Sequence, residues 1–134
     1  MKNDRDPDTI GLSLVVIVAE KHPIVRASLA TFLSYDGYRV FQAENLSAAI
    51  SFINHIIDVE VLLVDLDMPG WKSILHHALN SAPDALVIAT AGVETIPEIS
   101  DLKQSGIDVC LQKPLVYSDI RRAITETVGR RRAA

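Results

Sequence analysis

The sequence predicts an α/β protein with a doubly wound, five-stranded parallel sheet in strand order 2-1-3-4-5. Two observations support this prediction. Five short apolar runs, of the kind that form buried strands, alternate with five stretches of helical periodicity. The chain is also 49% hydrophobic but only 5% aromatic, as expected of an aliphatic sheet covered on both faces. Such alternation requires right-handed crossovers and therefore parallel strands.

Turn and cap residues mark the limits of each element. Strands are expected at 12–19, 38–43, 60–65, 85–90 and 107–112, and helices at 23–36, 47–57, 71–80, 97–105 and 118–128. Pro23 suits the first turn of a helix, and Gly37 can adopt the left-handed conformation that ends one. The first helix is expected to carry its apolar residues on one side, namely Ile24, Leu29, Phe32 and Leu33.

Length and charge indicate a single domain of 134 residues. We expect a flexible polar tail at 1–11, the domain at 12–129, and a basic end at 130–134 that is either a solvated helix end or the start of a linker. The net charge of −4 gives no basic surface for nucleic acid, so any such contact would belong to a separate output domain. The absence of a long apolar run predicts a cytoplasmic protein that makes no membrane contact.

Polar residues follow the carboxyl ends of four predicted strands, and Asp65 is the central one. It ends the run Val61-Leu62-Leu63-Val64 and opens the turn Asp-Leu-Asp-Met-Pro-Gly. In the order 2-1-3-4-5, the ends of strands one, three, four and five converge at the topological switch point. The other residues at these ends are Glu20, Lys21, Thr90, Ala91 and Lys113. A carboxylate nucleophile flanked by a hydroxyl and an ammonium suits phosphoryl transfer.

These motifs, in this order, resemble the receiver domain of the response regulators of two-component signalling systems. The resemblance covers essentially all of the chain after the tail, and it implies a flavodoxin-like fold. It also implies that Asp65 accepts a phosphoryl group from a histidine kinase or phosphotransfer protein, with Thr90, Ala91 and Lys113 holding or sensing that group. The start Glu20-Lys21-His22-Pro23 looks most like the subfamily with helix-turn-helix output domains.

The same resemblance predicts a signalling domain that is not an enzyme, and a weak homodimer. Receiver-like chains commonly pair through the face of the fourth helix, the fifth strand and the fifth helix, or through the first and fifth helices. The apolar residues expected to form that contact are Ile96, Ile99, Leu102, Ile120 and Ile124.

The acid pair is atypical, because Lys21 replaces a carboxylate that coordinates a divalent ion in the family, and Glu20 replaces the usual Asp. Two readings follow. Either the carboxylate of Asp67 supplies the missing magnesium ligand, or the Lys21 ammonium stands in for the metal and pairs with Asp65. We favour the second reading, so magnesium binding is expected to be weak.

A second departure is Cys110, which stands where the family usually has an aromatic residue coupled to the switch hydroxyl. Lys21 and Cys110 together favour an alternative function, a pseudo-receiver that acts as a phosphorylation-independent protein interaction module. The retained Asp65, Thr90 and Lys113 favour the phosphoacceptor.

Overall fold

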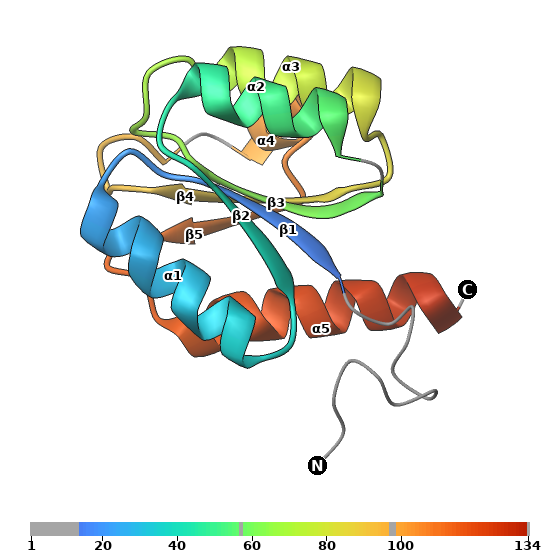
Figure 1. The fold of residues 1–134 in the computed structure, drawn as a ribbon. Coiled ribbons are helices and arrows are strands. Elements are labelled where there is room, and N and C mark those ends of the chain that lie inside the picture. The colour runs from blue at the N-terminus through green and yellow to red at the C-terminus, as the bar shows by residue number, and fades with distance from the viewer. Residues whose placement is uncertain (1–13, 57, 97–98, 134) are drawn as a thin grey trace.

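The predicted architecture is confirmed by a computed structural model, which describes residues 14–56, 58–96 and 99–133 (Figure 1). The expected flexible tail at 1–11 lies outside these residues. The strands are β1 (Val15–Ala19), β2 (Arg39–Ala43), β3 (Val59–Asp65), β4 (Leu86–Ala91) and β5 (Val109–Gln112). They form one parallel sheet in the order β2-β1-β3-β4-β5.

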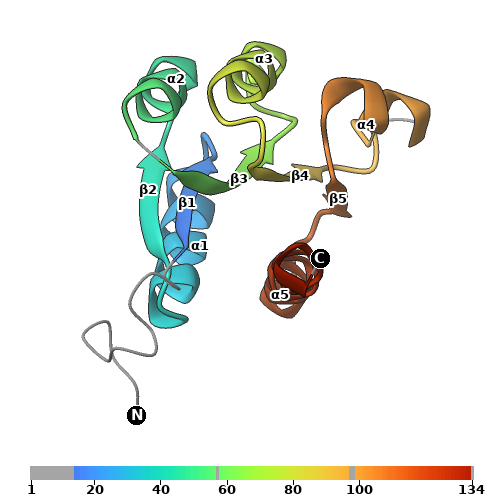
Figure 2. The same ribbon diagram turned by 90° about the vertical axis from the view of Figure 1, so that its right-hand side faces the viewer.

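Five helices connect the strands and cover both faces of the sheet. They are α1 (Pro23–Tyr35), α2 (Leu46–His55), α3 (Trp71–Ser81), α4 (Ile99–Ser105) and α5 (Tyr117–Ala133). Helices α2, α3 and α4 lie on one face, whereas α1 and α5 lie on the other (Figures 1 and 2). Each face has its own aliphatic core, and the central strands β1, β3 and β4 contribute side chains to both cores.

Local signals explain where several helices begin and end. Pro23 opens α1, and Gly37 follows the helix at φ 95°, as predicted. Helix α2 starts one residue earlier than expected because the Asn45 side chain accepts a hydrogen bond from the Ala48 amide at 2.9 Å. Helix α5 runs to Ala133, past its expected end at 128. The arginines near its C-terminus favour this extension, because arginine is a good helix former and its positive charge interacts favourably with the helix dipole.

The apolar side predicted for α1 is wrong for half of its residues. Leu29 and Leu33 are buried against the sheet, but Ile24 is 72% exposed and Phe32 is 52% exposed. The spacing of these residues gives the reason. Ile24, Ser28 and Phe32 follow one another at intervals of four, on a stripe rotated away from that of Leu29 and Leu33. The polar Ser28 in the middle of the outer stripe was the available sign that this stripe is not core.

Candidate functional site

Asp65 is the last residue of β3 and lies opposite Thr90 of β4 in the sheet register. The residue is only 2% exposed. Its Oδ1 accepts hydrogen bonds from the Lys113 ammonium at 2.8 Å and from the Asp67 amide at 2.9 Å. The buried Oδ2 has no hydrogen-bond donor among the described residues. One carboxylate oxygen is thus held in place and the other is free to react or to bind a cation.

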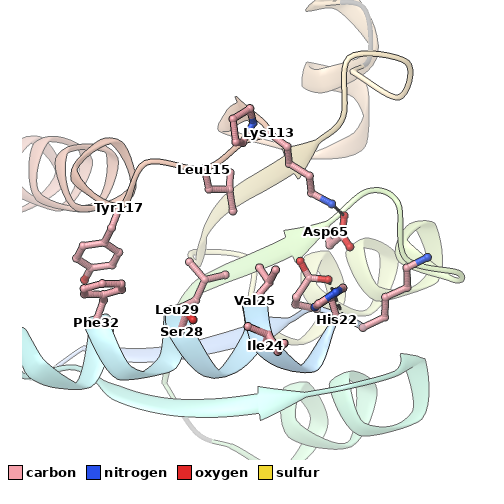
Figure 3. Close-up of a pocket in the computed structure, with 13 residues that line it drawn as sticks. His22, Ile24, Val25, Ser28, Leu29, Phe32, Asp65, Lys113, Leu115 and Tyr117 are labelled. Atoms are coloured by element: carbon pink, nitrogen blue, oxygen red, sulfur yellow. Dashed lines mark hydrogen bonds and ion pairs between the residues drawn. The ribbon is translucent and has the colours of Figure 1, made fainter.

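Lys113 follows β5, and its backbone amide donates to the Ala91 carbonyl at 2.8 Å. Its side chain reaches across the strand ends toward Asp65 (Figure 3). The ammonium is shared, because it also donates to Asp67 Oδ2 at 2.9 Å. Partial burial acts to lower the pKa of Lys113, but the hydrogen bonds to Asp65 and Asp67 outweigh it and raise that pKa. Lys113 is therefore a fixed positive charge at the site.

Thr90 and Ala91 form the end of β4 beside Asp65. Both are buried, and the Thr90 carbonyl accepts a hydrogen bond from the Leu66 amide at 2.8 Å. This bond fixes the backbone at the point where the chain leaves β3. The structure thus brings Thr90, Ala91 and Lys113 to the same sheet edge as Asp65.

Glu20 follows β1 and is a second buried acid, only 3% exposed. Its Oε2 accepts a hydrogen bond from the His22 amide at 3.1 Å. Burial, together with the neighbouring Asp65 carboxyl, raises the pKa of Glu20 to about 7. Two carboxyl groups therefore share a small volume, an arrangement that a cation would stabilise.

Lys21 does not pair with Asp65, so the predicted substitution of its ammonium for a metal ion is wrong in this structure. The Lys21 side chain is exposed, and the cation on Asp65 is Lys113. The physical reason is hydration, since a lysine on a flexible stem keeps its ammonium in water at the surface, while Lys113 supplies the positive charge at Asp65 Oδ1. Lys21 remains at the rim of the site.

Asp67, the alternative candidate for a magnesium ligand, has its carboxylate engaged by other groups in this structure. Its Oδ2 is occupied by the Lys113 ammonium and by the Gly92 amide at 3.2 Å. Hydrogen bonds from the Thr95 hydroxyl and from Lys113 hold the pKa of Asp67 below its usual range. Within the described part of the chain, no cluster of three or more His, Cys, Asp or Glu side chains could hold a metal ion. The contact between Asp67 and Lys113 was not predicted from the sequence.

Cys110 lies in β5 opposite Ala89 and is half-buried against the core shared with α3 and α4. Burial raises the pKa of its thiol, which keeps the group neutral. The position therefore holds a small neutral side chain with no ring to rotate.

A groove of about 520 Å³ runs from the acid pair between α1 and the segment that leads from β5 into α5. Ile24, Val25 and Leu29 of α1 line one side, and Leu115 lines the other (Figure 3). Phe32 and Tyr117 lie at the end away from Asp65, and their rings stack with centroids 5.0 Å apart. The residues wrongly assigned to the core of α1 thus line an apolar groove that ends at the buried carboxylate.

A parallel sheet of this order, with an aspartate at its switch point and a lysine bonded to that aspartate, defines a class of signalling domains. The model of the response regulator receiver domain family matches residues 16–125. The chain belongs to this family, as its motifs predicted. Within the described residues, no helix is long and apolar enough to cross a membrane.

Curated relatives contain this domain as part of longer proteins. The chain is 24% identical over 120 residues to a cyclic di-GMP phosphodiesterase of Thermotoga maritima, covering 88% of this chain and 32% of that protein. It is 29% identical over 118 residues to the sensor histidine kinase RcsC of Escherichia coli, covering 84% of this chain and 12% of the kinase. The chain thus spans a third or less of the length of these relatives.

Solved structures share the fold. A CheY-like receiver domain protein from Methanospirillum hungatei superposes with a TM-score of 0.79 at 17% identity, covering 90% of this chain and 98% of that chain. A response regulator from Burkholderia pseudomallei was solved with a phosphorylated aspartic acid, a calcium ion and citrate. It superposes with a TM-score of 0.73 at 23% identity, covering 90% of this chain and 72% of that chain.

Proposed function

We propose that this receiver domain is a phosphoacceptor, in which Asp65 receives a phosphoryl group from a histidine kinase or a histidine phosphotransfer protein. The observation that carries the proposal is the state of the Asp65 carboxylate. Oδ1 is fixed by Lys113 and a backbone amide, whereas the buried Oδ2 has no donor among the described residues. A positioned carboxylate oxygen without a partner is a suitable nucleophile.

The transfer needs no further covalent group from the protein. A lone pair of Asp65 attacks phosphorus, an O–P bond forms, and the bond from phosphorus to the donor histidine nitrogen breaks, leaving its electron pair on the imidazole. The Lys113 ammonium neutralises a phosphoryl oxygen, and Thr90, adjacent in register, offers its hydroxyl. The small Ala91 leaves room for the group beside it.

The donor set fits one magnesium ion. Magnesium is commonly bound by one or two carboxylates together with substrate phosphates, and Asp65 and Glu20 provide two carboxylates. When bound, the ion would neutralise charge on the transferring phosphoryl group. Weak binding remains our expectation, because Lys21 supplies no carboxylate and Asp67 is engaged elsewhere.

The groove along α1 supports docking of a helical histidine donor. It is apolar along Ile24, Leu29 and Leu115, and it leads directly to Asp65. A helix that lays apolar side chains into such a groove could bring its phosphohistidine to the carboxylate.

We also propose a cytoplasmic location and, for nucleic acid, contact only through an output domain outside this chain.

Intact-mass measurement after incubation with acetyl phosphate tests the proposal. We expect a gain of one phosphoryl group in the presence of magnesium, and no gain in Asp65→Asn, which keeps the shape of the side chain but lacks the nucleophile. Hydroxylamine should remove the added mass, as it does from acyl phosphates. No gain by the unmodified chain at high magnesium would contradict the proposal.

The second candidate function is the pseudo-receiver, and one observation favours it. The Lys113 ammonium is already held by two carboxylates, so the unphosphorylated pocket has its cation in place without a phosphoryl group. In this case the protein would bind its partner without any mass gain, and Asp65→Asn would leave that binding intact. The same mass measurement therefore separates the two functions.

A further inference from the structure

Asp67 makes contacts that the proposed phosphoryl chemistry does not require. It lies in the turn after β3, and its side chain is 28% exposed. The Oδ2 atom accepts from Lys113 Nζ at 2.9 Å and from the Gly92 amide at 3.2 Å. Two donors from different strand ends thus converge on one carboxylate oxygen.

The first consequence concerns Lys113. Its Nζ lies 2.8 Å from Asp65 Oδ1 and 2.9 Å from Asp67 Oδ2, so the single ammonium is divided between two anions. A phosphoryl group on Asp65 adds further negative charge and requires the same ammonium. Asp67 therefore competes with the phosphoryl group for the cation, and its own charge repels an anionic phosphodonor.

The second consequence concerns the turn Gly92–Thr95, which follows β4. The Gly92 carbonyl accepts hydrogen bonds from the Thr95 amide at 3.0 Å and the Thr95 hydroxyl at 3.2 Å. A Cβ atom at Gly92 would lie 3.6 Å from Asp67 Oδ2, so the carboxylate is in contact with this turn. Asp67 links Lys113 to the turn after β4.

We propose that Asp67 is a positioning residue that holds Lys113 against the turn Gly92–Thr95 and thereby slows phosphoryl acceptance by Asp65. The inference rests on the proposed function. Asp67 acts through Lys113 and does not touch the reacting oxygen, because the hydrogen bond between the two aspartates runs from the Asp67 amide to Asp65 Oδ1. The contacts of Asp67 also connect the site around Asp65 to the turn Gly92–Thr95 without involving Cys110.

The kinetic test compares the unmodified chain with Asp67→Asn in acetyl phosphate at saturating magnesium. Asparagine keeps an acceptor oxygen for Gly92 but removes the charge, so we expect phosphorylation to be about three- to ten-fold faster. Asp58→Asn is the matched control, because it removes the same charge at the far end of β3. Asp58 is exposed at φ 66°, a conformation that asparagine tolerates. We expect the control to react at the unmodified rate.

Two kinetic outcomes would overturn the inference. An unchanged rate in Asp67→Asn would mean that the carboxylate does not restrain Lys113. A slower rate with a larger magnesium requirement would mean that Asp67 is a metal ligand. A difference that shrinks as ionic strength rises would support the charge-based account.

A measurement without phosphoryl transfer separates this inference from the proposed function. In Asp67→Ala, the amide resonances of Gly92 and Thr95 should shift and exchange faster with solvent, whereas Asp58→Asn should leave both unchanged. Unchanged resonances in Asp67→Ala would overturn the link to the turn. If no variant accepts a phosphoryl group, the proposed function fails, and these resonances alone then decide whether Asp67 positions the turn.

Discussion

At the residue scale, the site depends on how one ammonium is distributed among three acids. Lys113 contacts Asp65 and Asp67 directly, and its charge also acts on Glu20. Glu20 has no cation of its own within the described contacts, and burial near Asp65 raises its pKa to about 7. The pocket is therefore short of positive charge, and a divalent ion is the natural way to supply it.

Replacing Lys113 with alanine should leave the fold intact and reduce phosphorylation by acetyl phosphate about 10²-fold, since it removes a donor to the transferring group. Lys113→Arg is the matched variant. It keeps the charge, but its planar fork does not reproduce the two contacts of the ammonium. Intact-mass measurements over time give the rate of phosphorylation, and circular dichroism shows whether each variant is folded. Normal phosphorylation of folded Lys113→Ala would show that the contact to Asp65 has no role in transfer.

Replacing Lys21 with aspartate should strengthen magnesium binding by on the order of ten-fold, because it restores a carboxylate next to Glu20 at the rim of the site. Titration of Trp71 fluorescence with magnesium measures the effect. Lys21→Ala removes the ammonium without adding a ligand, so it separates loss of charge from gain of a ligand. Equal affinities for the two variants would argue against a ligand role, and tight binding by the unmodified chain would refute our expectation of weak binding.

At the scale of elements, α1 serves two purposes on two faces. Leu33 anchors it to the sheet and Ile24 and Phe32 face the groove, whereas Leu29 is buried in the core and also lines the groove. Its end is joined to α5 by a clasp of four residues, namely Phe32, Asp36, Tyr117 and Arg121. The Arg121 guanidinium and the Tyr117 hydroxyl both donate to Asp36, and the two rings stack. The clasp fixes one end of the groove.

The clasp predicts a loss of stability in acid. Hydrogen bonds from Arg121 and Tyr117 outweigh burial and hold the pKa of Asp36 below its unfolded value of 3.8. The stabilisation is therefore fully present above that value and is lost as pH falls through the folded pKa. In thermal melts, Asp36→Asn should lower Tm by a few degrees at pH 7, and this difference should shrink toward pH 3.

Tyr117→Phe is the matched variant for the clasp. It removes one hydrogen bond, worth about 1–2 kcal/mol, while keeping the ring stacked on Phe32. We expect Tyr117→Phe to destabilise the protein at neutral pH. A Tm difference for Asp36→Asn that stays constant from pH 7 to pH 3 would contradict the role of the Asp36 charge.

The groove predicts a difference between phosphodonors. Ile24 is 72% exposed, so Ile24→Asp should change the free energy of unfolding by less than about 0.5 kcal/mol. A cognate histidine kinase can be identified by phosphotransfer profiling. Ile24→Asp should slow phosphoryl transfer from that kinase about ten-fold or more, while the rate of phosphorylation by acetyl phosphate stays the same. Tyr35→Asp is the control, because Tyr35 is 89% exposed on α1 but does not line the groove. Equal effects of the two variants would argue against docking in the groove.

At the scale of the whole molecule, the two cores leave less apolar surface for assembly than the sequence suggested. Ile120 and Ile124, which were expected to face a partner, are 0% and 1% exposed in the core beneath α5, so that part of the prediction is wrong. Among the other expected contacts, Ile96 is 42% exposed and Leu102 is half-buried. The side chain of Ile99 lies outside the described residues.

We still expect a weak homodimer, now through exposed residues that include Ile96, which precedes α4, and Val116, which precedes α5. Sedimentation equilibrium should show a concentration-dependent mass that rises further with acetyl phosphate. Ile96→Lys should shift the equilibrium toward monomer. A strict monomer at high concentration, both with and without the phosphodonor, would refute this prediction.

The sequence by itself determined the sheet, its order and the strand ends that meet at Asp65. Apolar runs report burial directly, and the chirality of crossovers leaves few ways to arrange five parallel strands. The positions of Asp65, Thr90 and Lys113 follow from that arrangement, because each directly ends or follows a buried run. Even the atypical Glu20 could be placed at the same edge by this reasoning.

Only the tertiary structure decided the partners of the side chains. Lys113 and Asp67 are 46 residues apart in sequence, and no local pattern indicates that they meet. Lys21 and Lys113 both follow strands that end beside Asp65, yet only the Lys113 side chain reaches it, whereas the Lys21 side chain is exposed. The outward direction of Ile24 and Phe32 was also decided in three dimensions, since a helix face becomes core only where the sheet covers it.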